Sequence, residues 1–240
     1  MTRHRLSPLW PVALATCAVV LGACTNTDPT TEADDTPTAQ PSDSPTATTS
    51  HAVTDLMEVP EDTALEPGTY SVGLLFADGP TRAVVDVPLG YHGGGPVIGS
   101  AGGDIAFWGS VTKVDTDPCL GGKHIGAGTS VHDLATRLGA LRHMRTSQPE
   151  PVTIGGFHGV HVRLTAPADL DRCRNGSVTI FTAGGPWLEW DIPGATFDEW
   201  ILDVHGTRVV GGARIHPSAA KPDEFIHMVE SATFTGAGRL

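Results

Sequence analysis

The sequence predicts an α+β domain in which a twisted antiparallel sheet of about seven strands carries one mid-chain amphipathic helix and one C-terminal helix. Most apolar runs are short, alternate with polar residues and are separated by turns that contain glycine or proline, as in hairpin-linked strands. Residues 130–143 and 221–230 instead repeat apolar residues at helical spacing. We expect a single folded domain over residues 63–240.

The first half of this domain begins with a hairpin, with strands at 69–76 and 81–87 on either side of an Asp-Gly-Pro turn. The glycine-rich segment HGGGPVIGSAGGD follows at 92–104. Its spacing matches neither a dinucleotide-binding nor a Walker motif, so we expect a flexible surface loop. Residues 105–114, rich in β-branched and aromatic side chains, form a further strand.

The helix over 130–143 has the clearest boundaries in the chain. Ser130 is placed to cap it, and Asp133 three residues later completes a capping-box pattern. Its apolar positions fall on one face: Val131, Leu134, Ala135, Leu138 and Leu141. Arg142 and His143 lie at the C-terminal end, where positive charge is favourable.

The segment PVTIGGFHGVHVRLTAP (151–167) predicts the central hairpin. Its first strand ends at Ile154, residues 155–159 form the turn, and the second strand runs from Val160 to Thr165. Because successive side chains of a strand alternate, His161 and Arg163 point away from the apolar row. We therefore expect one face of this strand on the core and the other in water.

Further strands are expected at 178–182 and 187–192. Residues 200–204 and 208–215 form a hairpin around His205-Gly206-Thr207. Pro222 suits the first turn of the closing helix at 221–230.

The N-terminus reads as a secretory leader over residues 1–23, with a basic start and an apolar run too short to span a membrane well. The tetrapeptide Leu21-Gly22-Ala23-Cys24 resembles a bacterial lipobox, which implies cleavage before Cys24 and acylation of its thiol. The alternative is an ordinary secretion signal with an incidental cysteine. Lipidation would place the protein on the extracytoplasmic face of the plasma membrane.

Residues 24–62 are rich in Thr, Pro, Ser, Asp and Ala and have few aliphatic residues, so we expect a disordered tether. It is either a plain spacer or an O-glycosylated one. Most of the net charge of −12 belongs to this front part, because no Lys or Arg occurs from residue 6 to residue 81. The domain has no basic patch, which argues against a nucleic-acid partner.

Four cysteines are present. Cys17 leaves with the leader and Cys24 carries lipid, so Cys119 and Cys173 remain in an oxidising compartment and are expected to form a disulfide. The alternative is a redox pair, although the sequence contains no C-x-x-C motif.

The eleven histidines invite a metal hypothesis. His132 and His143 share a helix face but lie too far apart to bind one ion. A site built from His158, His161 and a carboxylate is the alternative to solvated surface histidines, and we expect no metal. The adjacent acids Asp198 and Glu199 are expected to be solvated.

Catalytic motifs are missing from the sequence, since no G-x-S-x-G occurs. We expect no cofactor and no enzymatic activity. The late tryptophans Trp187, Trp190 and Trp200 form a candidate ligand surface for sugar or lipid wherever they are exposed, although most such aromatics belong to a core.

The order of elements carries a family resemblance. The segments VPLGY, DPC, PVTIGGFHGVHVRL, WILDVHGTRVV and VESATF, with the two helices, resemble actinobacterial secreted lipoproteins of unassigned role and are similar to the PsbP-like layout. The resemblance covers Thr63 to Phe234 and carries over no functional residue.

That resemblance implies a noncatalytic module that binds an unknown envelope protein or ligand. The second hypothesis is a carrier of a glycolipid or other apolar ligand, which needs a deep apolar pocket. The third is a hydrolase, which needs a cleft where Asp, His or Ser converge.

Overall fold

The computed structural model describes residues 52–77, 79–183 and 189–236. Within these ranges the chain forms eighteen strands, two α-helices and two short 3-10 helices, η1 (Leu56–Glu58) and η2 (Arg174–Gly176). The expected α+β class is therefore confirmed, but the strands form several sheets and outnumber the seven expected. No helix of the described part is long and apolar enough to cross a membrane. The leader, Cys24 and Trp187 lie outside the described residues.

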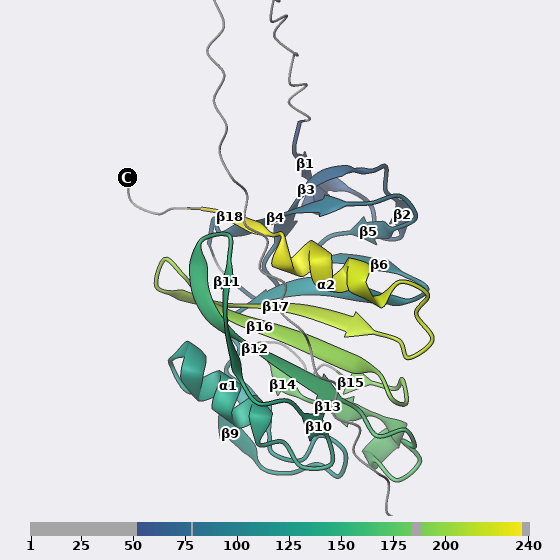
Figure 1. Cartoon of the computed structure of the whole chain (residues 1–240), viewed down its shortest axis with the longest axis vertical. Helices are drawn as coiled ribbons and strands as arrows, with labels where there is room; N and C mark the ends of the chain where they lie inside the picture. Colours follow the sequence, from purple (N-terminus) through teal and green to yellow (C-terminus); the bar gives the residue numbers. More distant parts are fainter. Residues whose placement is uncertain (1–51, 78, 184–188, 237–240) are drawn as a thin grey trace, which may run out of the picture. The chain divides into compact units, whose positions relative to one another are not determined.

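A nine-stranded antiparallel sheet forms the centre of the domain (Figure 1). Its order is β10-β12-β16-β17-β7-β6-β5-β2, with β11 also paired to β12. The strands are β2 (Thr63–Ala64), β5 (His92–Gly94), β6 (Val97–Ser100), β7 (Gly103–Gly109), β10 (Arg145–Thr146), β11 (Glu150–Ile154), β12 (Phe157–Thr165), β16 (Thr196–Val204) and β17 (Thr207–Ile215).

The hairpin of β16 and β17 confirms the turn expected from the sequence. His205 and Gly206 both have positive φ, 52° and 80°, as a two-residue turn of type I′ requires. Asp203 accepts a hydrogen bond from the Gly206 N–H at 2.8 Å. The strand alternation sends Phe197 and Ile201 to one face of the sheet and Trp200 and Leu202 to the other.

The β11–β12 hairpin exists, but two details of its prediction were wrong. Its turn is only Gly155-Gly156, so β12 begins at Phe157 rather than Val160. The face that carries His161 is not in water, because the His161 ring stacks on the buried Trp200 with centroids 4.8 Å apart. Both faces of the sheet are covered here, which a single strand's alternation does not reveal.

One face is covered by the α2-side layer: α2 (Pro222–Glu230) and the sheet β1-β3-β4-β18 (Figure 1). Its strands are β1 (Thr54–Asp55), β3 (Gly68–Gly73), β4 (Arg82–Val87) and β18 (Thr233–Thr235). β3 and β4 confirm the first expected hairpin. The boundary at Thr63 was too late, because β1 pairs with β3 and Leu56 is fully buried.

The opposite face is covered by the α1-side layer, which combines α1 (Val131–Gly139) with five short strands (Figure 1). They are β8 (Lys113–Asp115), β9 (His124–Gly126), β13 (Val178–Thr179), β14 (Phe181–Thr182) and β15 (Glu189–Trp190). The capping box of Ser130 and Asp133 is present. The helix ends before His143, whose Nδ1 instead lies 2.9 Å from Asp117.

The glycine-rich segment was wrongly expected to be a loop, since it contains β5 and β6. Gly93 shows why glycine is needed there. A Cβ on this residue would lie 2.8 Å from the Val97 carbonyl oxygen across the hairpin. The long strand expected over 105–114 is also interrupted, because Ser110 has a φ of 52° and the chain passes from β7 into another sheet.

Candidate functional site

A slot of about 480 Å³ lies on the α1-side face of the central sheet, over β5, β6 and the start of β7. The register places four residues in one row across these strands, in the order His92, Gly99, Asp104 and Arg214. Alternation puts Asp104 on the same face as Trp108, which belongs to the α1-side core. This part of the face is open, and Val97 within it is 37% exposed.

Glycines form the floor of the slot. A Cβ on Gly99 would lie 3.2 Å from the Gly103 carbonyl oxygen and 3.3 Å from the Cβ of Asp104. A Cβ on Gly94 would collide with the Pro60 carbonyl oxygen, so its absence lets the 60–63 turn pack closely and brings Glu61 and Asp62 to the rim. The slot therefore exists because side chains are missing from the middle of a sheet face.

Asp104 lines the slot, and Arg214, which does not line it, forms a direct ion pair with this carboxylate. The Arg214 guanidinium also lies over the Trp190 ring, 5.9 Å from its centroid. Burial raises the pKa of Asp104, and the charge of Arg214 and its hydrogen bond offset that rise only in part. These contacts hold both groups in fixed orientations beside the open floor.

The remaining polar groups at the slot are accessible. Glu61, Asp62 and His92 are exposed, and the Ser100 hydroxyl accepts a hydrogen bond from the Gly102 N–H at 3.2 Å. Among the described residues, no hydrogen bond joins Ser100 and His92. The arrangement can orient a polar ligand through hydrogen bonds and charge.

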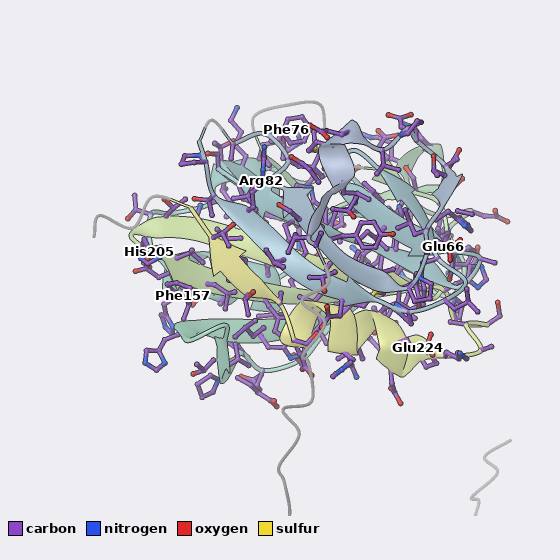
Figure 2. All side chains as sticks on the ribbon, turned by 90° about the horizontal axis from the view of Figure 1, so that it is seen from above. Glu66, Phe76, Arg82, Phe157, His205 and Glu224 are labelled. Atoms are coloured by element: carbon purple, nitrogen blue, oxygen red, sulfur yellow. A yellow bond between two sulfur atoms is a disulfide. The ribbon has the colours of Figure 1, made fainter. Side chains whose placement is uncertain are left out.

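A second depression, of about 580 Å³, adjoins the slot and shares His92 and Ser100 with it. Glu224, near the N-terminal end of α2, accepts hydrogen bonds from the Tyr91 hydroxyl at 3.1 Å and from Lys221 at 2.7 Å. Burial, together with the hydrogen bond to Glu224, raises the pKa of Tyr91. Glu224 lies at the opposite end of the view from Phe157 and His205, whose rings are 4.8 Å apart (Figure 2).

A buried ionic cluster lies on the α2-side face, outside both depressions. Asp198 Oδ1 accepts hydrogen bonds from Arg163 Nε and His161 Nε2, both at 2.7 Å. The Asp198 side chain is 1% exposed, whereas His161 is 18% and Arg163 48% exposed. A carboxylate that orients a histidine could serve a general base, but none of the five described depressions includes these three residues.

The structure places the tryptophans of the candidate ligand surface differently from the sequence prediction. Trp190 is 6% exposed and Trp200 is fully buried, so neither offers a binding surface. Trp190 packs against Phe181 and Phe197 in the α1-side core. A large aromatic in a strand is equally suited to a core or a surface, and only the covering layers decide between them.

The histidines considered as metal ligands have separate partners. His158 Nδ1 lies 3.1 Å from the Thr153 hydroxyl, and His161 pairs with Asp198. His132 and His158 line one depression of about 440 Å³, while His143 lies beside Asp117. Over the ranges that the structure describes, no three His, Cys, Asp or Glu side chains come together as a metal site.

The disulfide between Cys119 and Cys173 is present, as expected, and both residues are buried. The loop around it depends on two buried aspartates. Asp115 accepts hydrogen bonds from the Asp117 and Gly122 N–H groups at 2.9 and 2.8 Å. Asp117 accepts one from the Leu120 N–H at 3.0 Å. Burial opposes its ionisation, but Leu120, His143 and Arg142 outweigh burial and lower the pKa of Asp117.

Sequence reasoning missed several residues of these sites. Asp198 and Glu199 were wrongly expected to be solvated, since they are 0% and 2% exposed. The sequence did contain a signal of burial, because both acids lie between Phe197 and Trp200 in the run TFDEWILDV. His92, Asp104 and Arg214 carried no local signal, because their proximity depends on the pairing of strands far apart in the chain.

No protein-family model matches the chain, and no curated protein matches it. The likeness to actinobacterial lipoproteins with a PsbP-like layout therefore stays a prediction from the sequence.

Proposed function

We propose that the protein is a noncatalytic binding module, anchored by lipid on Cys24 to the extracytoplasmic face of the plasma membrane, and that its ligand occupies the slot over β5, β6 and β7. The single observation that supports this most is the slot's glycine floor beside the fixed Asp104–Arg214 pair. Its size is within the range of small-molecule sites, roughly 300 to 1,000 Å³. Its exposed polar side chains Glu61, Asp62 and His92 are placed to bind and orient a polar ligand.

Site-specific photocrosslinking in cells tests the binding site. A diazirine amino acid replaces Val97 inside the slot or, as the control, Leu120, which is 49% exposed and does not line it. We expect a discrete adduct from position 97 that disappears when Gly99→Leu fills the floor. Equal adducts from both positions, or an adduct that survives Gly99→Leu, would contradict the proposal.

The anchor is tested separately. Cells that express the full chain are labelled with an alkyne analogue of palmitate, and wild type is compared with Cys24→Ala. We expect label and membrane association only in the wild type, since several acyl chains at one residue give stable anchoring. Equal labelling of the two proteins would refute lipidation at Cys24. The remaining hypothesis would then be an ordinary secretion signal.

A carrier of an apolar ligand is the second candidate, and the depression beside α2 favours it. It is lined by Ala219, Phe225 and Leu89, and the last of these is 74% exposed. Mass spectrometry of organic extracts from gently purified protein tests this hypothesis. A lipid that copurifies in stoichiometric amount supports the carrier, and an extract without one excludes it for the purified state.

A further inference from the structure

Two adjacent acids on β16 are buried on opposite faces of the central sheet. Asp198 shares its face with Trp200 and Leu202, and Glu199 shares the other with Phe197 and Ile201. Asp198 is 0% and Glu199 2% exposed. Two ionised carboxylates at neighbouring positions repel each other, so the surroundings of each acid decide which of them carries charge.

On the α2-side face, the Arg163 guanidinium neutralises Asp198. Arg163 and His161 of β12 both bond its Oδ1. Arg163 also feels the negative charges of Asp223 on α2 and Glu150 on β11, which help to raise its pKa after the hydrogen bond to Asp198. Arg163 therefore remains protonated, and it stabilises a negative charge on Asp198.

On the α1-side face, Glu199 lacks such partners. Its Oε2 is buried without a hydrogen-bond partner among the described residues. Asp198 Oδ2 also lacks one, but Asp198 has Arg163 as a cationic partner and Glu199 has no such offset in the described part of the chain. The side chain extends over Gly212 of β17, since a Cβ on that glycine would lie 2.9 Å from Oε2 and would also meet the Trp108 ring. Val162 is its neighbour on β12, and α1 covers this face with Leu134 and Leu138. A charge here would face apolar groups.

Two arginines on the elements around Glu199, Arg214 and Arg137, form no ion pair with it among the described residues. Arg214 on β17 pairs with Asp104 of β7. Arg137 on α1 has a buried Nε without a hydrogen-bond partner among the described residues, and Glu199 Oε2 also has none. Burial, and secondarily the negative charge of Asp198, raise the pKa of Glu199 well above its ordinary value of 4.5.

We propose that Asp198 and Glu199 form a proton-dependent switch across the central sheet, in which the pair holds one negative charge, on Asp198, and a second charge on Glu199 loosens the α1-side layer. The folded domain keeps the Glu199 proton at pH values where the unfolded chain has released it. The free energy of unfolding therefore falls as the pH rises above 4.5, until Glu199 ionises in the folded domain.

Hydrogen exchange of backbone amides tests the switch, with rates expressed as protection factors to remove the intrinsic effect of pH. The domain is compared as wild type, Glu199→Gln and Glu189→Gln, the last being a control on an exposed glutamate of the same layer. From about pH 5 to about pH 9 we expect protection in α1 to fall about tenfold more than in α2. Glu189→Gln should keep this difference and Glu199→Gln should lose it.

Equal loss of protection in α1 and α2 of the wild type would overturn the proposal, whether or not Glu199→Gln folds. Persistence of the α1-specific loss in Glu199→Gln would overturn it as well.

Discussion

The two layers that cover the central sheet are built in different ways. The α2-side layer consists of a regular hairpin, β3–β4, and a helix, and the buried acid on its face, Asp198, is paired with Arg163. The α1-side layer consists of one helix and strands of two or three residues, closed by a disulfide, and among the described residues no cation offsets the burial of the acid on its face, Glu199.

This difference indicates what each layer depends on. Continuous backbone hydrogen bonding and apolar packing hold the α2-side layer together. The α1-side layer has little regular structure, so it depends on a covalent link, on aspartates that accept loop N–H groups and, in our proposal, on a protonated Glu199. Substitutions can therefore destabilise one layer more than the other.

The largest effect is expected from the disulfide. Replacing both Cys119 and Cys173 by Ala should lower the free energy of unfolding by about 4 kcal/mol, because the link closes a long loop, of sequence separation 54. Denaturant unfolding gives the total loss, and limited proteolysis should locate the first cuts in the α1-side layer. First cuts in β3 or β4 would contradict the distinction between the layers.

The second largest effect on the free energy of unfolding is expected from Arg163→Met. It leaves the charge of Asp198 buried with His161 alone, and we expect a loss of about 2 kcal/mol. This lies below the cost for a fully buried pair because water reaches Arg163, which is 48% exposed. The control Arg172→Met removes a side chain that is 89% exposed and should change stability by less than about 0.5 kcal/mol. Equal losses of stability for Arg163→Met and Arg172→Met, in thermal or denaturant unfolding, would show that the ion pair between Arg163 and Asp198 does not stabilise the fold.

Asp117→Asn should cost about 1 to 2 kcal/mol near neutral pH, because a charge-assisted acceptor for Leu120 and His143 is lost. Since the folded state lowers the pKa of Asp117, its contribution is present above the ordinary value of 3.8 and disappears as the pH falls through the folded value. The two proteins should therefore converge in stability in acid. A difference that stays constant with pH would exclude this explanation.

The smallest effect on stability is expected in the slot. Val97→Trp fills open space beside Gly99, so the free energy of unfolding should change by no more than about 0.5 kcal/mol. Ligand capture should nevertheless be lost, whereas Leu120→Trp should retain it. Unchanged capture by Val97→Trp would place the binding surface elsewhere.

Elements with a local signal were predictable from the sequence. Ser130 and Asp133 determine the start of α1, and the His205-Gly206 pair determines the β16–β17 turn. The cysteine pair followed from compartment and elimination. The β5–β6 hairpin was missed because glycine has low strand propensity, and there the fit of neighbouring backbones, as at Gly93, outweighs propensity.

The candidate sites were harder to predict, because their partners come from distant strands. Asp198 meets Arg163 only because β12 and β16 pair in one register, and Asp104 meets Arg214 through β7 and β17. Burial also depends on the layers that cover the sheet. They bury Trp190 and Trp200, which were candidates for a ligand surface. A single strand's pattern identifies its two faces but not what covers them.

The charge states of Asp198 and Glu199 underlie the contrast between the layers. The most direct measurement is a pH titration of the Glu199 side-chain carboxyl carbon by ¹³C NMR. We predict a Glu199 signal that stays protonated well above the ordinary pKa of 4.5, because burial raises the pKa of this side chain. A Glu199 signal that titrates near the ordinary pKa of 4.5 would contradict the proposal.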